Sequence, residues 1–584
     1  MRTFFKFTFA TIFGLFLFCI LSVVILAVIG SASSSGDPDV KDNSILKISL
    51  NKPFAERERE EPFGDLEIPG NDGGVIGLYD LKKAIRNAKD DSKIKGIYLD
   101  CGMGRIGYGT NEELRNTLLD FKKSGKFIYA YGEYYSESNY YLASLADSIY
   151  LNPEGLLEFN GLSSDVMFFK GMLDKLEVKP EIFRVGDFKS AVEPFFRESM
   201  SDANRLQYTS FLNSINGHVI AQVAASRKLP VEVVKVISDS MKVRNSEDAV
   251  RLGMISKAAY YDQVLATLKK KTGAEKDEDL HFISYSKYKK ADDSEKEVSG
   301  NKIAVIVAQG EISGGKGDDE TIGSDKIAET LRKARNDKNV KAVVLRINSP
   351  GGSALASDVM WREIMLTKKV KPIIASMSDV AASGGYYMAM GCHKIVAQPT
   401  TITGSIGVFG LMFNAQDFFK NKLGISFDGV KTGTYSDIGN MTRPLTPGER
   451  QIIQSEVNKI YDTFTSKAAE GRKMDVEALR KLAGGRVWSG TEAKQNGLVD
   501  ELGGLEKAVE LAAAQAKLGK DYRLKLMPVQ KNFLDQIMEQ LGGQAKISVL
   551  KAELGDLYPV VKQMQKLKTM EGIQARLPID FILN

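Results

Sequence analysis

Hydrophobic positions divide the chain into one unbroken apolar run at the N-terminus and a long body of alternating helix-like and strand-like patterns. The run from Phe7 to Gly30 contains no charge and is about 24 residues long, enough for a helix to cross a bilayer about 30 Å thick. A cleaved signal peptide usually has an apolar core of about 7–15 residues, so we expect an uncleaved transmembrane anchor over residues 1–30. Arg2 and Lys6 place the N-terminus inside by the positive-inside rule.

The residues after this run form a polar linker. Residues 31–44 are rich in Ser, Gly and Asp, which is typical of a flexible tether. The small residues Ser31-Ala32-Ser33 also resemble a signal-peptide cleavage site, so the sequence leaves open whether the anchor is retained.

The body contains one pattern twice. GLYDLKKAIRNAKDDSKIKGIYLDCGMG, which begins at Gly77, matches GSDKIAETLRKARNDKNVKAVVLRINSPGG, which begins at Gly323. Each segment combines an amphipathic helix, a polar turn and a β-branched strand that ends in glycines, and further matches follow in the same order. The pattern predicts an internal duplication, and its strands alternating with helices predict the α/β class with largely parallel sheets covered by helices.

The duplication sets the expected domain borders. We expect a first α/β domain over residues 45–283 and a second over residues 302–519. Residues 284–301 are charged and lack apolar periodicity, so they read as the linker between the domains. The tail, residues 520–584, is predicted to be partly helical because Phe533–Leu541 has a helical pattern.

Composition excludes several function classes. The 584 residues carry a net charge of only +5 with no basic block, so we expect no nucleic-acid partner. The three cysteines are far apart and none has CxxC spacing, which argues against a metal site or a disulfide framework. Pairing of Cys101 with Cys392 stays open, and we expect no cofactor.

The first candidate for chemistry is Ser383, in SDVAASGGYYMAMG. An apolar strand-like segment, Pro372–Ser376, leads to small residues around this serine, and a helix-like segment follows. A nucleophile needs a sharp backbone turn and close approach of substrate, which Gly384 and Gly385 permit. The same residues are also compatible with an ordinary buried turn.

Comparing the two repeats adds a second candidate. Aligning their paired tyrosines places Glu137 opposite Ser383, and aligning RVGDFKS with KTGTYSD places Lys189 opposite Ser436. Lys189 follows Glu137 by 52 positions (189 − 137), and Ser436 follows Ser383 by 53 (436 − 383). This spacing suggests an ancestral unit with both a serine and a lysine, of which each half has kept one. A single site would then be assembled across the two halves.

The surroundings of Lys189 favour a role as a base. Most of its neighbours are apolar, and a lysine held there would have a lowered pKa, as a general base requires, whereas most lysines lie on the surface. The three histidines, His218, His281 and His393, have no such setting, and His393 reads as structural. The sequence therefore favours a Ser-Lys dyad over a Ser-His-Asp triad.

Glycines provide candidate oxyanion donors. Gly351 and Gly352 end a hydrophobic strand in RINSPGGS, where their N–H groups can line a cleft, and the Gly384 N–H adjoins the nucleophile. The alternative for Gly351-Gly352 is a plain turn after a strand.

Four motifs together resemble the signal peptide peptidase A family in its long, duplicated bacterial form, a serine protease family with a Ser-Lys dyad. They are FRVGDFKSAVEPFFRESMS, RINSPGGS, SDVAASGGYYMA and TTITGSIGVFG, and the match extends to about residue 515. The resemblance implies two tandem crotonase/caseinolytic-protease-like domains built from ββα units. It also implies Ser383 as nucleophile, Lys189 as base, and Ser405 as a hydroxyl that orients the lysine amine.

The resemblance further implies a location and a substrate. It predicts a single-pass protein of the bacterial inner membrane whose catalytic domains face the periplasm and form a homo-oligomer, with a tetramer expected. Its substrates would be apolar peptides, in particular signal peptides left after cleavage. Two alternatives stay open: a non-catalytic membrane-anchored scaffold, and an acyl-CoA enzyme of the same fold, which we rank last because acyl-CoA is absent outside the cytoplasm.

Overall fold

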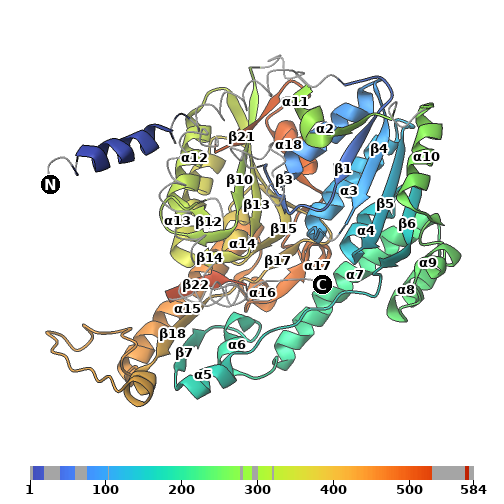
Figure 1. The fold of residues 1–584 in the computed structure, drawn as a ribbon. Helices are drawn as coiled ribbons and strands as arrows, with labels where there is room; N and C mark the ends of the chain where they lie inside the picture. The colour runs from blue at the N-terminus through green and yellow to red at the C-terminus, as the bar shows by residue number, and fades with distance from the viewer. Residues whose placement is uncertain are drawn as a thin grey trace.

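The computed structural model describes residues 4, 6–18, 21, 40–58, 75–102, 104–275, 280–291, 300–318, 321–528 and 572–577. Residues 6–18 are helical and exposed, and Figure 1 shows this helix standing apart from the body. Within the described ranges, no helix is both long enough and apolar enough to span a bilayer. Residues 22–30 of the expected anchor lie outside those ranges.

The first half is built on a six-stranded parallel sheet covered by helices (Figure 1). In spatial order its strands are β8 (Lys257–Ala258), β6 (Ser148–Leu157), β5 (Phe127–Tyr135), β4 (Ile94–Cys101), β1 (Ser44–Ser49) and β9 (Phe282–Ser284). Its main helices are α2 (Leu78–Asp90), α3 (Tyr108–Lys122), α4 (Glu137–Ala143), α7 (Asp202–Arg227), α8 (Val231–Asp239), α9 (Ser246–Arg251), α10 (Tyr261–Thr272) and α11 (Tyr285–Ala291). The strands are nearly continuous in apolar residues because both faces of the sheet are covered.

The second half repeats this arrangement. Its sheet runs β19 (Val487–Ser489), β17 (Ile402–Gly404), β15 (Ile373–Ala382), β13 (Val340–Ser349), β10 (Lys302–Gln309) and β21 (Arg523–Met527), with β16 (Lys394–Ala397) and β20 (Glu501–Leu502) attached beside β15. Its helices are α12 (Ser324–Asn336), α13 (Ala354–Lys368), α14 (Gly384–Ala389), α15 (Pro447–Arg472), α16 (Val476–Leu482), α17 (Gly490–Gln495) and α18 (Leu505–Gln515).

The predicted duplication is confirmed by equivalent elements in the two halves. β1 lies between β4 and β9, and β10 lies between β13 and β21 in the same way. The long helices α7 and α15 each have 26 residues. The α/β prediction is therefore also confirmed.

A third sheet joins the halves. Its order is β12 (Thr321–Gly323), β11 (Glu311–Ser313), β14 (Gly351–Ser353), β22 (Gly572–Arg576), β18 (Phe409–Asn414) and β7 (Lys179–Arg184). Strand β7 comes from the first half, yet it pairs antiparallel with β18 of the second along its whole length. The chain that leaves β7 therefore enters the second half, and this segment contains Lys189.

Buried charges also connect the halves. The Arg346 guanidinium on β13 lies 2.7 Å from Glu56 and 2.5 Å from Glu113, both in the first half. Lys82 on α2 lies 2.5 Å from Glu113 and 2.6 Å from Glu506 on α18. Removing one partner would leave a buried charge uncompensated, which typically costs about 3–5 kcal/mol. This network therefore fixes how the halves sit against each other.

Some segments differ from their expected form. Tyr285–Ala291, expected within a linker, forms helix α11 because Tyr288 is buried and its hydroxyl bonds to Asp91 at 3.0 Å. Residues 292–299 and the expected helix over Phe533–Leu541 lie outside the described ranges. Cys101 and Cys392 are both free and buried.

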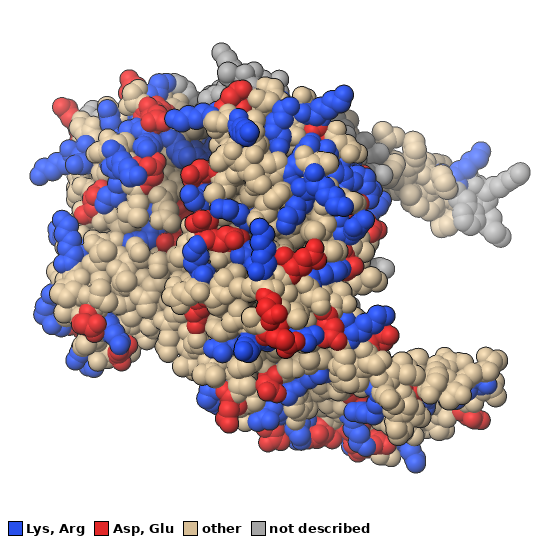
Figure 2. Space-filling model, turned by 180° about the vertical axis from the view of Figure 1, so that it is seen from behind, with Lys and Arg blue, Asp and Glu red and all other residues tan. Residues whose placement is uncertain are grey.

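The surface seen from behind carries charges of both signs. Figure 2 shows Lys and Arg side chains intermingled with Asp and Glu over the body, while the projecting segment at the lower right shows mostly other residues. Mixed charge of this kind is typical of a solvated surface.

Candidate active site

Ser383 lies at the sharp turn between strand β15 and helix α14. Its backbone has φ +55° and ψ −111°, a conformation that non-glycine residues rarely adopt. Its N–H donates to the Gly404 carbonyl at 2.8 Å, and its side chain is fully buried. A side chain on Gly385 would lie 2.9 Å from the Ser349 carbonyl, so the turn needs glycine there. A strained strand-to-helix turn is the setting in which many hydrolases hold a nucleophile.

Lys189 reaches this serine from the first half. Its Nζ lies 2.9 Å from Ser383 Oγ, 3.0 Å from Ser405 Oγ and 3.2 Å from the Ser405 carbonyl. The lysine is almost wholly buried, and this burial lowers the pKa of its ammonium well below the ordinary value of 10.5. Removal from water disfavours the charged form, so the amine tends to be neutral and can accept a proton.

Ser405 completes the polar surroundings of the amine. It has φ +49°, and its N–H donates to the Arg486 carbonyl at 2.7 Å. Its side chain is 1% exposed. The carbonyl and hydroxyl oxygens of Ser405 thus both lie within hydrogen-bond distance of Lys189 Nζ.

The backbone of Lys189 is held by groups that the sequence analysis missed. Gln207 on α7 donates to the Phe188 carbonyl at 3.1 Å and to Ser190 Oγ at 2.9 Å, one residue on each side of the lysine. Gly485 also lies against the backbone of Lys189, so closely that a Cβ on this glycine would lie 2.5 Å from the Lys189 Cα. The Gly-Gly pair in KLAGGRVW was the available signal for this close approach.

The three glycines predicted for the oxyanion hole lie together. A Cβ on Gly351, which has φ +101°, would lie 2.8 Å from the Gly384 nitrogen. The Gly351 N–H already donates to Ser349 Oγ at 3.2 Å. The Gly351 N–H is therefore already engaged by a side chain of the protein.

The histidines take structural contacts instead. His393 Nδ1 accepts from the Ile373 N–H at 3.2 Å, and His218 Nε2 lies 3.1 Å from Glu112. The His281 carbonyl accepts from the Ile45 N–H at 2.8 Å. Each of the three histidines therefore has a contact that does not involve Ser383.

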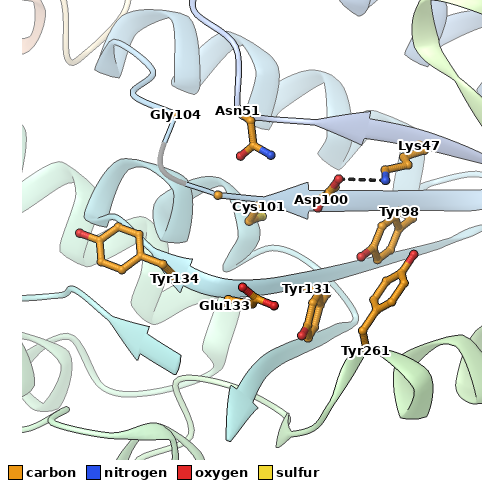
Figure 3. Close-up of a pocket in the computed structure, with 11 residues that line it drawn as sticks. Lys47, Asn51, Tyr98, Asp100, Cys101, Gly104, Tyr131, Glu133, Tyr134 and Tyr261 are labelled. Carbon is orange, nitrogen blue, oxygen red and sulfur yellow. Dashed lines mark ion pairs between the residues drawn. The ribbon is translucent and has the colours of Figure 1, made fainter. Parts of the chain in front are cut away.

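The described residues also form cavities away from Ser383 and Lys189. Figure 3 shows one of about 680 Å³ at the ends of β1, β4 and β5, where Tyr131 and Tyr261 lie beside Tyr98 and Lys47 pairs with Asp100. Its lining includes none of the six candidate site residues. A second, of about 880 Å³, lies where the halves meet and contains Glu137, the counterpart of Ser383.

Comparison with known proteins places the chain in a family. The model of Peptidase family S49 matches two segments, residues 120–275 and 365–519, one in each half.

Curated relatives match over most of their length. The chain is 34% identical over 548 residues to the chloroplastic serine protease SPPA of Arabidopsis thaliana, covering 92% of this chain and 78% of the relative. It is 37% identical over 479 residues to Protease 4 of Salmonella typhi, covering 80% and 76%. Among solved structures, a ClpP1 mutant of Listeria monocytogenes aligns at 17% identity over 35% of this chain and 94% of its own, with a TM-score of 0.24, too low to establish a shared fold.

Proposed function

The chain belongs to peptidase family S49 and is a serine peptidase, and we propose that Ser383 is its nucleophile and Lys189 its general base. The observation that carries the proposal is the 2.9 Å separation of Lys189 Nζ from Ser383 Oγ in a buried site. The expected domain over 45–283 would supply the lysine, and the domain over 302–519 the serine.

The proposed reaction begins with proton transfer. Neutral Lys189 accepts the proton of Ser383 Oγ, which attacks the scissile carbonyl carbon of a peptide. The N–H groups of Gly352 and Gly384 would stabilise the negative charge on the carbonyl oxygen. Lys189 then gives its proton to the leaving amine, and water hydrolyses the acyl-enzyme. The nucleophile, the proton carrier and the oxyanion donors of this scheme all belong to the chain itself.

We propose apolar peptides, in particular remnant signal peptides, as substrates. The supporting features are the apolar run Phe7–Gly30, which would hold the protein at a membrane, and the small and apolar residues around Ser383. With Arg2 and Lys6 inside, the catalytic halves would face the periplasm as a single-pass inner-membrane protein.

We also propose a homo-oligomer, with a tetramer expected. An arm over residues 418–446 projects from the body (Figure 1). Its exposed large apolar side chains are Leu423, Ile425, Phe427, Val430, Tyr435, Ile438 and Met441. Val430 is fully exposed. Contiguous exposed apolar groups commonly mark protein or membrane contacts. Light scattering on detergent-purified protein would test this, and a monomer would contradict it.

The catalytic assignment is tested by a fluorophosphonate probe on the full-length protein, followed by peptide mapping. We expect label on Ser383, no label in Ser383→Ala, and no label in Lys189→Ala at the same exposure. The exposed residues Ser436 and Lys175 provide matched controls, and Ser436→Ala and Lys175→Ala should label like the wild type. A folded protein without label on Ser383 would contradict the assignment and favour the non-catalytic scaffold.

A further inference from the structure

One buried amide side chain lies between the two segments that carry the proposed dyad. Gln207, on α7, is fully buried, and Figure 1 shows this helix of the first half running beside α17 of the second. Side chains on α7 contact the second half directly: Ser210 Oγ donates to Glu492, and Ser214 Oγ lies 2.7 Å from Ser489 Oγ. Gln207 is therefore placed where both halves can reach its amide.

The amide nitrogen of Gln207 faces the segment that contains Lys189. Its Nε2 donates to the Phe188 carbonyl at 3.1 Å and to Ser190 Oγ at 2.9 Å. These two residues come directly before and directly after the lysine. The backbone on both sides of Lys189 is thus tied to α7, which sets the point from which the lysine side chain extends.

The amide oxygen of Gln207 faces the second half. Its Oε1 accepts from the Val487 N–H on β19 at 3.1 Å. Val487 pairs with Gly404 on β17, and the Gly404 carbonyl accepts from the Ser383 N–H at 2.8 Å. The carbonyl of the residue before Val487 accepts from the Ser405 N–H at 2.7 Å. One strand pair thus connects the amide oxygen to the backbone of both serines of the site.

The orientation of this amide is fixed by its partners. Only the oxygen can accept from the Val487 N–H, and only the nitrogen can donate to the Phe188 carbonyl. Nε2 also lies 2.9 Å from Asn204 Oδ1, and Asn204 Nδ2 donates to the buried Glu193 at 3.1 Å. A buried polar network with its members bonded in this way is rigid, so the amide can hold its neighbours in place.

The corresponding position of the second half carries no amide. Helix α15 has the length of α7, and each helix begins after a hydroxyl residue that caps it, Ser201 or Thr446. Gln207 and Ile452 both come six residues after these caps (207 − 201 and 452 − 446), and Ile452 is exposed. The half that has Ser436 in place of the lysine thus has an apolar residue in place of the glutamine. The amide accompanies the lysine rather than the helix.

We propose that Gln207 is a positioning residue that sets the separation of Lys189 Nζ from Ser383 Oγ. It does so by joining the lysine segment of the first half to the β17–β19 pair of the second. This inference rests on the proposed function. Gln207 acts through the backbone of its neighbours, and its loss would let the two segments shift against each other. A shift of about 1 Å between catalytic groups can lower a rate about 100-fold.

Gln207→Leu tests the inference because it removes both sets of hydrogen bonds with little change of volume. We expect kcat to fall about 10- to 100-fold with KM within about twofold of wild type, since the groups that bind substrate remain. Labelling of Ser383 by the fluorophosphonate should slow by the same factor. Circular dichroism would select a temperature at which the variant is folded. Gln451→Leu, at an exposed glutamine on α15, is the matched control and should behave as wild type.

The outcomes separate positioning from folding. A folded Gln207→Leu protein with wild-type kcat would overturn the inference, even if its thermal stability were lower. If Gln207→Leu does not fold, Ser190→Ala decides, because it removes a contact on the lysine side and keeps the one to Val487. We expect kcat of Ser190→Ala to fall about fivefold with KM unchanged, and a wild-type kcat would again overturn the inference. A wild-type protein that neither labels nor cleaves peptides would instead overturn the proposed function.

Discussion

Helices α4 and α14 begin at equivalent places in the two halves, and the residues at their N-terminal ends have opposite uses. Helix α4 directly follows strand β5 in the first half, and helix α14 directly follows strand β15 in the second. The paired tyrosines show how closely the frames correspond. The Tyr140 hydroxyl bonds to the Met254 carbonyl at 2.7 Å, and the Tyr386 hydroxyl bonds to the Leu498 carbonyl at 2.9 Å.

Within this shared frame the two halves carry different residues at the start of the helix, Glu137 in the first and Ser383 in the second. Glu137 Oε2 accepts from the backbone N–H groups of Asn160 at 3.1 Å and Gly161 at 2.8 Å, and burial raises the pKa of its carboxyl. Ser383 instead faces the amine of Lys189. The Glu137 carboxyl group thus accepts hydrogen bonds from backbone N–H groups of its own half. The Ser383 hydroxyl instead contacts a lysine amine that comes from the other half.

The comparison shows why the lysine and the carboxylate must be kept apart. An opposite charge within about 4–6 Å favours the charged form of a lysine, so a carboxylate at the position of Ser383 would raise the pKa of Lys189. Strand β7 carries the lysine across to the half that has a serine at this place. In the second half, the counterpart residue Ser436 lies exposed on the projecting arm.

Lys189→Met removes the amine with little change of volume and should have the largest effect. We expect peptidase activity to fall by about 10³-fold, the scale of a lost general base. The variant should also be more stable at pH 7, because folding of the wild type has to bury a lysine that is charged when unfolded. Activity assays and thermal unfolding would measure both changes, with Lys175→Met as the control.

The pH dependence of that stability difference is a further check on Lys189. Its folded pKa lies below its unfolded value, so the cost of folding is absent above the unfolded pKa and grows as pH falls through that value. The advantage of Lys189→Met should therefore shrink as pH is raised toward 10.5. An advantage that is constant with pH would contradict a neutral buried lysine.

The pH dependence of kcat/KM for the wild-type protein should reflect the titration of Lys189. Only neutral Lys189 can accept the serine proton, so kcat/KM should rise about tenfold per pH unit below its folded pKa and then level off. Because burial lowers that pKa, the plateau should begin well below pH 10.5. A rise that continues to pH 10.5 would mean that the lysine is not depressed in the active protein.

Ser405→Ala should produce an intermediate effect. The hydroxyl lies 3.0 Å from Lys189 Nζ, and its loss would leave the amine less well directed at Ser383. We expect kcat to fall about 10- to 100-fold with KM nearly unchanged, on the scale of a small misplacement of catalytic groups. Loss of an acceptor also disfavours the ammonium, so the rising limb of the pH profile should move to lower pH. An unchanged profile with lower stability would indicate a purely structural role.

The sequence was most informative where one half could be compared with the other. Matching segments predicted the duplication, and the shared spacing predicted that Ser383 and Lys189 belong to one site. The structure places these two side chains 2.9 Å apart. The spacing could link the two positions because both lie in segments whose length the repeat preserves.

Contacts between distant segments left no such signal. Lys82 lies in an amphipathic helix and reads as a surface lysine, yet it is buried in the network around Glu113 because the second half covers it. Gln207 is a polar residue within a long helix. Its hydrogen bond to the Phe188 carbonyl depends on the position of the segment that follows β7, which the sequence does not show. The pairing of β22 could not be predicted either, since five residues are too few for a periodic pattern.

Glu137→Ser gives the first half the residue of the second, and it should have the smallest effect on activity. Among the residues that the structure describes, no lysine amine bonds to Glu137, whose Oε2 accepts from the Asn160 and Gly161 N–H groups. We expect peptidase activity within about twofold of wild type and no probe label on the new serine, since an unactivated serine is a weak nucleophile. Ser383→Ala combined with Glu137→Ser should remain inactive. Label or activity in that double variant would show that the first half also supplies a base to position 137. It would contradict the proposal that the first half contributes only the lysine and the second half only the serine.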